Sequence, residues 1–292
     1  MQLKFLLFIL FVGTNFPIFS QGKFDSVKKL LNENKFLLAQ RFLKENLNDS
    51  ELGKLYLGDI HSHLNQWDDA ISYYEDLVEL KPEVALYNFK LGGALGMKAM
   101  EINKFQAAFL IPDIKKYLEK AVSLDPKHIE AHRALSQLYV ELRSVLGGSL
   151  EKSLIHAKKL ENLGLLDYRI AMAFIYAHKD NDAIAGNLIK KAIDESKQNP
   201  SLLIRNYLYF ELAQEAVRFQ VASSAVDDLM QKFVEGFNYL DLKTPAEAYL
   251  KLAQLSEKRG NQKDAKKYIT KSLGYDANDE TALELQEDIN DM

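Results

Sequence analysis

Histidine side chains can bind metals or move protons, so their spacing is the first test for chemistry in this chain. There are six of them: His61, His63, His128, His132, His156 and His178. His61 and His63 are two apart on a predicted helix and therefore point to different faces. His128 and His132 have the helical spacing of four, but His128 follows Pro126 closely and is expected to precede the helix. No His-Glu-x-x-His element and no third ligand accompany them, so we predict no metal site.

Other arrangements typical of catalysis are missing from the sequence. The chain has no cysteine, which excludes disulfides and thiolate chemistry. It has no glycine-rich phosphate loop and no Gly-x-Ser-x-Gly nucleophile elbow. Acidic pairs such as Asp68-Asp69 and Asp227-Asp228 are interpreted as solvated helix residues. We therefore expect no enzyme, no catalytic residue and no cofactor. The alternative, a site assembled across helices, would need a buried carboxylate–histidine pair in a cleft.

The composition is that of a globular, helix-rich protein. Of 292 residues, 47% are hydrophobic and 27% charged, while glycine (14) and proline (6) are scarce. Alanine, leucine, lysine and glutamate are plentiful, and these residues favour helices. The formal net charge is -4 and no basic block exists. We therefore expect no nucleic-acid partner.

The first twenty residues have the layout of a secretory signal peptide. Lys4 precedes an apolar run from Phe5 to Val12, and Gly13 and Pro17 interrupt it. The run is too short to span a bilayer about 30 Å thick, which requires roughly 20 residues. We predict a signal peptide at residues 1–20 with cleavage after Ser20, and a mature chain that has no transmembrane segment and is periplasmic or extracellular. An uncleaved N-terminal anchor is the alternative.

A spacing pattern recurs along the rest of the chain. It is present in WDDAISYYEDLVELKP at 67–82, in IPDIKKYLEKAVSLDP at 111–126, and again around Ala185 and Ala265. In the first copy, the offsets of four and three from Ala70 to Tyr74 and Leu77 place these residues on one helical stripe. The terminal proline ends the helix. Another helix precedes each copy, so the unit is an antiparallel helix pair of about 34 residues.

This unit resembles the tetratricopeptide repeat, whose pattern has Leu-Gly or Leu-Ala, then Tyr, Ala, an aromatic residue, Ala and Pro at set positions. The best copies span 51–82 and 246–277. The resemblance implies an all-α fold, a right-handed α-solenoid of antiparallel helix pairs. A C-terminal capping helix, DETALELQEDIND, with Asp279 or Asn278 as its N-cap, is expected to close the array.

The whole mature chain, residues 21–292, is expected to form one solenoid of about six helix pairs. The clearest units are 51–84, 85–128, 129–165, 166–200 and 246–279, and the degenerate ones are 21–50 and 201–245. The second unit is about ten residues longer than the others, and its second helix is expected to begin around Pro112. An insertion at Gly147-Gly148-Ser149 is interpreted as a helix connector in which Ser149 is a cap, or as a loop that touches a partner.

The resemblance also implies a function. The first helix of each pair is expected to line a concave face that holds a peptide or a partner helix. By the family's positions, the partner-binding residues are Asp59, His63, Phe89, Arg133, Gln137, Phe174, His178 and Gln254. We therefore expect a non-catalytic scaffold that binds proteins in the cell envelope, of unspecified oligomeric state. The alternative is a secretion or transport accessory, or a chaperone-like protein, that holds a small ligand or an unfolded client in the groove.

The segment from 207 to 239 is unusually rich in aromatic residues. They are Tyr207, Tyr209, Phe210, Phe219, Phe233, Phe237 and Tyr239. We interpret them as the filling of an irregular helical core, and a surface patch that binds a protein or glycan is the alternative.

Overall fold

The fold is described by a computed structural model that covers residues 18–241 and 243–291. Over these residues it contains helices and no strand. The α-helices are α1 (Ile18–Asn32), α2 (Phe36–Asn46), α3 (Glu51–His63), α4 (Trp67–Leu80), α5 (Ala85–Glu101), α6 (Lys104–Leu124), α7 (Ile129–Glu141), α8 (Leu150–Leu160), α9 (Leu165–His178), α10 (Asp182–Gln198), α11 (Tyr207–Arg218), α12 (Val226–Glu235), α13 (Pro245–Lys258), α14 (Gln262–Tyr275) and α15 (Glu280–Asp291). Three short 3-10 helices, η1 (Ser144–Leu146), η2 (Pro200–Leu202) and η3 (Ser223–Ala225), join some of them.

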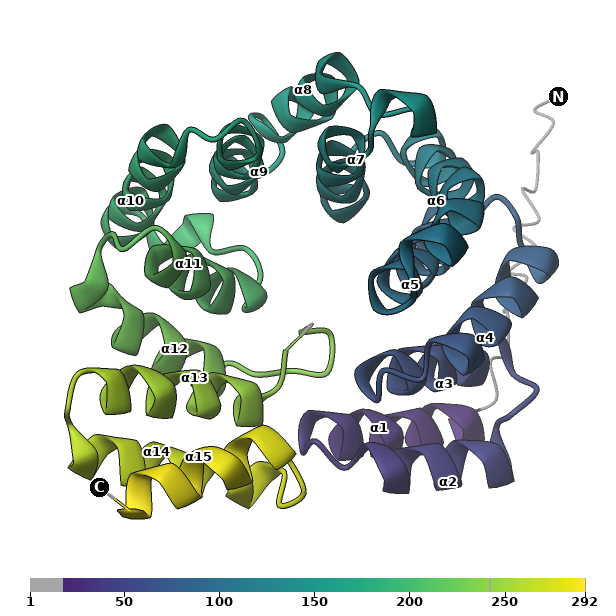
Figure 1. Cartoon of the computed structure of the whole chain (residues 1–292). Helices are drawn as coiled ribbons and strands as arrows, with labels where there is room; N and C mark the ends of the chain where they lie inside the picture. Colours follow the sequence, from purple (N-terminus) through teal and green to yellow (C-terminus); the bar gives the residue numbers. More distant parts are fainter. Residues whose placement is uncertain (1–17, 242, 292) are drawn as a thin grey trace, which may run out of the picture.

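The helices form successive pairs that curve into a ring (Figure 1). Helices α5, α7, α9 and α11 lie towards the middle of the ring, and α6, α8 and α10 form its outer layer. The segment between α12 and α13 binds Asn32 of α1 and His63 of α3, so the array closes on its N-terminal helices (Figure 1). The predicted all-α solenoid of helix pairs is confirmed.

The repeated stripe is what holds each pair together. Ala70, Tyr74 and Leu77 of α4 are buried, and the Tyr74 ring packs directly on the backbone of α3 at Gly58. A β-carbon at Gly58 would lie 2.5 Å from that ring, so the small residue permits the close approach of the two helices. Ala185, Ile189 and Ala192 of α10 form the same buried stripe. The core therefore lies between the two helical layers.

The start of α6 differs from the prediction. We expected this helix to begin near Pro112, but it begins at Lys104 and runs through Pro112. The Asn103 side chain accepts a hydrogen bond from the Gln106 amide at 3.0 Å and caps the helix there. Within this added stretch, Leu110 packs partly buried against the core cluster that contains Ile114 and Leu118, so the helix continues although proline cannot donate its backbone hydrogen bond. The proline is exposed, where a distorted turn is tolerated.

Local capping signals agree with the sequence. Ser149 accepts from the Lys152 amide at 3.2 Å and begins α8, and Asp279 accepts from the Ala282 amide at 3.1 Å and begins α15. His128 is the N-cap of α7, which confirms that it precedes the helix.

The predicted signal peptide lies outside the described residues up to position 17, and its last three residues begin α1. Among the described residues, no helix combines the length and apolar character that a membrane crossing requires.

Candidate partner-binding site

An ion-pair network crosses the inner layer of the ring. Arg133 of α7 donates to Asp167 Oδ1 of α9 at 3.0 Å and to Glu211 Oε2 of α11 at 2.8 Å. A second contact, from Arg133 Nη2 to Glu211 Oε1, makes the Glu211 pair bidentate. Burial alone would lower the pKa of Arg133, but the carboxylates of Glu211 and Asp167 raise it above its usual value. This guanidinium therefore stays charged and holds three inner helices together.

Arg205 extends the network to the edge of the ring. It contacts Asp167 and lies 3.2 Å from Glu130 Oε1 of α7. Burial opposes ionisation of Glu130, yet His128 and Arg205 lower its pKa to about 2. Asp167 is fully buried, and among the described residues its Oδ2 atom has no hydrogen-bond partner. The charges of this cluster are thus mainly satisfied within the chain.

Two other predicted groove residues also bind within the chain. Asp59 of α3 is buried, accepts from the Tyr74 hydroxyl at 2.7 Å and lies 2.8 Å from Lys90 Nζ of α5. His63, at the end of α3, stacks on Phe36 with ring centroids 4.6 Å apart. Its Nε2 lies 2.7 Å from the carbonyl oxygen of Tyr239, and burial lowers its pKa. Its imidazole is therefore neutral and donates Nε2–H to that carbonyl.

The remaining predicted residues make fewer contacts of this kind within the chain. Phe89 of α5 packs against His128, with ring centroids 4.7 Å apart. Gln137, Phe174 and Gln254 are partly buried, and His178 is exposed.

Four of the inner side chains lie on two adjacent helices, α7 and α9. Gln137 and Glu141 lie four apart on α7, Phe174 and His178 lie four apart on α9, and the two helices pack on each other. Burial raises the pKa of Glu141, and the nearby His178 acts against this shift. We call these four residues the α7–α9 patch.

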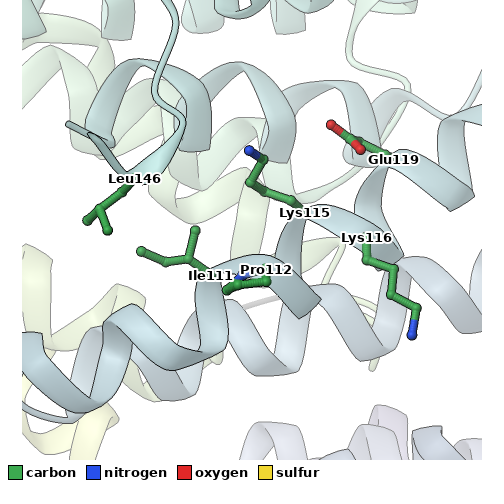
Figure 2. Close-up of a pocket in the computed structure, with 6 residues that line it drawn as sticks. All are labelled: Ile111, Pro112, Lys115, Lys116, Glu119 and Leu146. Carbon is green, nitrogen blue, oxygen red and sulfur yellow. The ribbon is translucent and has the colours of Figure 1, made fainter. Parts of the chain in front are cut away.

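The insertion at Gly147-Gly148 lies against α6. Leu146 faces Ile111, Pro112 and Lys115 across an open hollow of about 300 Å³ (Figure 2). Gly147 has φ of 84°, and a β-carbon at Gly148 would lie 1.8 Å from the Leu142 carbonyl oxygen. Both glycines are therefore required by the turn itself.

The most exposed large apolar side chains gather at the insertion and the lengthened second unit. They are Val145 (89%), Met100 (77%), Phe105 (76%) and Phe109 (69%). Both places where the chain departs from the repeat length therefore carry apolar surface.

His132 and His156 form a hydrogen-bonded pair. His132 Nε2 lies 3.0 Å from the Pro126 carbonyl oxygen, and its Nδ1 lies 3.0 Å from His156 Nδ1. Since the carbonyl can only accept, His132 carries its proton on Nε2, and His156 donates Nδ1–H to it. Within the described residues, no three His, Asp or Glu side chains are placed to hold a metal ion.

The aromatic residues of 207–239 fill the core, as interpreted. Phe210 and Phe233 are buried, and Tyr207, Tyr209, Phe219 and Phe237 pack partly buried around the same core. Tyr239 is the exception, because it packs on the N-terminal helices instead. The sequence contained no signal for this contact, nor for the roles of Asp167, Arg205 and Glu211.

Helix pairs, buried small residues and a curved inner layer define the α-solenoid class, whose members present extended surfaces for binding. Family models described as "Tetratricopeptide repeat" match residues 54–83 and 246–279. These two segments are therefore tetratricopeptide repeats, a unit whose proteins are generally non-catalytic interaction scaffolds.

Solved structures share this fold at low identity. A thermophilic tetratricopeptide repeat protein of Thermus thermophilus is 17% identical with a TM-score of 0.52, and the match covers 68% of this chain and 98% of that one. Human IFIT1, solved as a dimer with PPP-AAAA, is 18% identical with a TM-score of 0.54, covering 86% of this chain and 54% of that one. No curated protein matches the chain.

Proposed function

We propose that this protein is an exported, non-catalytic scaffold of the cell envelope that binds a peptide or a partner helix on the inner face of its ring. The export step rests on the signal-peptide pattern of residues 1–20. N-terminal sequencing of the protein recovered from the envelope or medium tests it. A new N-terminus at Gln21 is expected, and an intact Met1 in a membrane fraction contradicts it.

The choice of binding site rests on a difference among the inner residues: some are bonded within the described part of the chain and others are not. Arg133, Asp59 and His63 are bound to partners within the chain. The α7–α9 patch, in contrast, offers an amide, a carboxylate, an aromatic ring and an exposed imidazole on two adjacent helices. A preformed surface of this kind binds an extended segment with little ordering cost to itself.

A pair of matched double variants tests this site. Gln137→Ala/Phe174→Ala removes an amide and an apolar group from the patch, and Asn187→Ala/Ile184→Ala removes the same kinds of group from the outer helix α10, where both residues are exposed. Tagged mature proteins would be used to capture partners from the organism's own envelope fraction. Loss of a partner with the first variant alone is expected. Identical partners with all three proteins would exclude the patch.

The alternative of a small ligand or unfolded client in the groove would be favoured by exposed aromatic side chains facing the cavity. The aromatic residues of 207–239 lie in the core or on the N-terminal helices. No observation therefore favours this alternative over a protein partner.

A further inference from the structure

Tyr239, in the segment between α12 and α13, is held by side chains of the N-terminal helices. Its amide donates to Asn32 Oδ1 at 3.1 Å, and its carbonyl accepts from His63 Nε2 at 2.7 Å, although 207 and 176 positions separate the partners. Its ring lies 5.7 Å from the ring of Tyr56, nearly perpendicular to it. Both backbone polar groups and the side chain of one residue are thus bound, as they are in a captured peptide.

The residues that hold Tyr239 are fixed by the N-terminal helices themselves. Asn32 is the last residue of α1 and His63 the last of α3, so both stand at helix ends. Phe36 stacks on the His63 ring, and Phe24 packs beside Tyr56 with ring centroids 5.9 Å apart. These contacts do not involve Tyr239, so they hold the His63 and Tyr56 rings in place independently of it. His63 also occupies a position where the family resemblance implies contact with a partner.

The segment that carries Tyr239 is itself a constrained turn. The Asp241 carboxylate is buried and accepts from the Asn238 amide and from Asn206 Nδ2, both at 2.9 Å. The Leu240 amide donates to Asn238 Oδ1 at 3.0 Å. These bonds fix the base of the turn on α11, and Tyr239 projects from it towards α3.

We propose that Asn32, Tyr56 and His63 form a peptide subsite for an aromatic residue, and that Tyr239 occupies this subsite as an internal ligand in the free protein. This inference rests on the proposed function, because it names the chemistry of a partner: a peptide segment that carries tyrosine or phenylalanine. Asn32 and His63 bind backbone groups, which every residue has, so the ring slot beside Tyr56 supplies the selectivity. A partner binds by displacing Tyr239.

The internal ligand sets a barrier to binding in trans. A tethered segment competes at an effective concentration of about millimolar, so an isolated peptide binds the wild-type chain weakly. Removing the internal ring should therefore expose the subsite. The heptapeptide EGFNYLD, residues 235–241, is the natural probe.

The test is fluorescence anisotropy of the labelled heptapeptide with the full mature chain. The Tyr239→Gly variant is expected to bind the peptide about tenfold or more tightly than the wild type does. The same peptide with alanine for tyrosine should bind neither protein. A peptide that fails to bind Tyr239→Gly, or binds both proteins equally, overturns the proposal.

Two further variants control for folding. Tyr239→Phe keeps the ring and both backbone contacts, and should bind peptide as weakly as the wild type does. Asn206→Ser loosens the turn without changing Asn32, Tyr56 or His63, and should bind peptide more tightly than the wild type even if Tyr239→Gly folds poorly. Purified components are used throughout, so failure here removes the subsite and leaves the α7–α9 patch to its own test.

Discussion

Arg133 on α7 and Glu211 on α11 form a bidentate ion pair, although 78 positions and an intervening helix pair separate them in the chain. In a solenoid, contacts normally join neighbouring units. This pair skips one unit, and Asp167 of the skipped helix α9 binds the same guanidinium. The pair therefore contributes to the curvature of the ring.

Glu211→Ala should lower the free energy of unfolding by about 3 kcal/mol, because it leaves the Arg133 guanidinium buried with one fewer carboxylate. Urea unfolding monitored by circular dichroism measures the change. Lys232→Ala is the control, since Lys232 and Asp228 form an exposed pair on α12 and its loss should cost about 0.5 kcal/mol or less. Equal effects of the two substitutions would show that the Arg133 network adds nothing to stability.

The stability of the protein should decrease as the pH falls from about 6.5. Burial and the neighbouring His132 lower the pKa of His156 from 6.5 to about 4, and burial lowers the pKa of His132. As the pH falls, the folded protein binds fewer protons at these two rings than the unfolded chain does, which favours unfolding. The urea midpoint should therefore be lower at pH 5.5 than at pH 7.5.

His156→Asn is the control for this pH dependence. The asparagine amide replaces the Nδ1–H donor without a titrating group, so the loss of stability between pH 7.5 and pH 5.5 should be smaller. Burial raises the pKa values of Glu141, Glu215 and Asp241, and these groups act in the opposite direction as the pH falls, so the comparison with His156→Asn isolates the histidine contribution. An unchanged difference in His156→Asn would assign the effect to other groups.

Two glycine substitutions should change the free energy of unfolding in opposite directions. Gly58→Ala places a methyl group 2.5 Å from the Tyr74 ring and should cost about 1–3 kcal/mol, as overpacking does. Gly93→Ala in α5 meets no heavy atom within 4 Å and should stabilise by about 0.5–1 kcal/mol, because alanine favours a helix interior. Thermal unfolding of both variants checks this. A stabilising Gly58→Ala would contradict the packing of α3 on α4.

The exposed aromatic pair of α6 should be dispensable for folding. Phe105→Ser/Phe109→Ser removes two exposed rings whose centroids lie 5.2 Å apart. The free energy of unfolding should therefore change by about 0.5 kcal/mol or less. Binding of a hydrophobic dye by the folded protein should decrease. A loss above about 2 kcal/mol would show that the rings contribute to the core.

The repeated stripe made the fold predictable. Ala70, Tyr74 and Leu77 have a spacing that buries them on one face, and this relation is local. The start of α6 was not predictable from Pro112, because proline ends helices on average, whereas here the helix starts at the Asn103 cap and Leu110 packs on the core before the proline.

The site was predictable to a smaller degree. The repeat pattern assigns a residue such as Arg133 to the inner face, but it does not say which side chain lies opposite. Glu211 and Arg205 belong to the most degenerate part of the sequence, where no register could be assigned. Tyr239 is aromatic like its neighbours in the sequence. Only its contact with Tyr56 of α3 in the folded chain distinguishes it from them.

The contact at Tyr239 also bears on how the chain folds. Helix pairs that dock on their neighbours involve short loops and assemble quickly, whereas the bonds of Tyr239 to His63 and Asn32 close loops of 176 and 207 residues. This closure forms after both ends of the array have folded. An open solenoid frays independently at each terminus. Here the first repeats share a contact with the segment between α12 and α13, so loosening of the first repeats also loosens that segment.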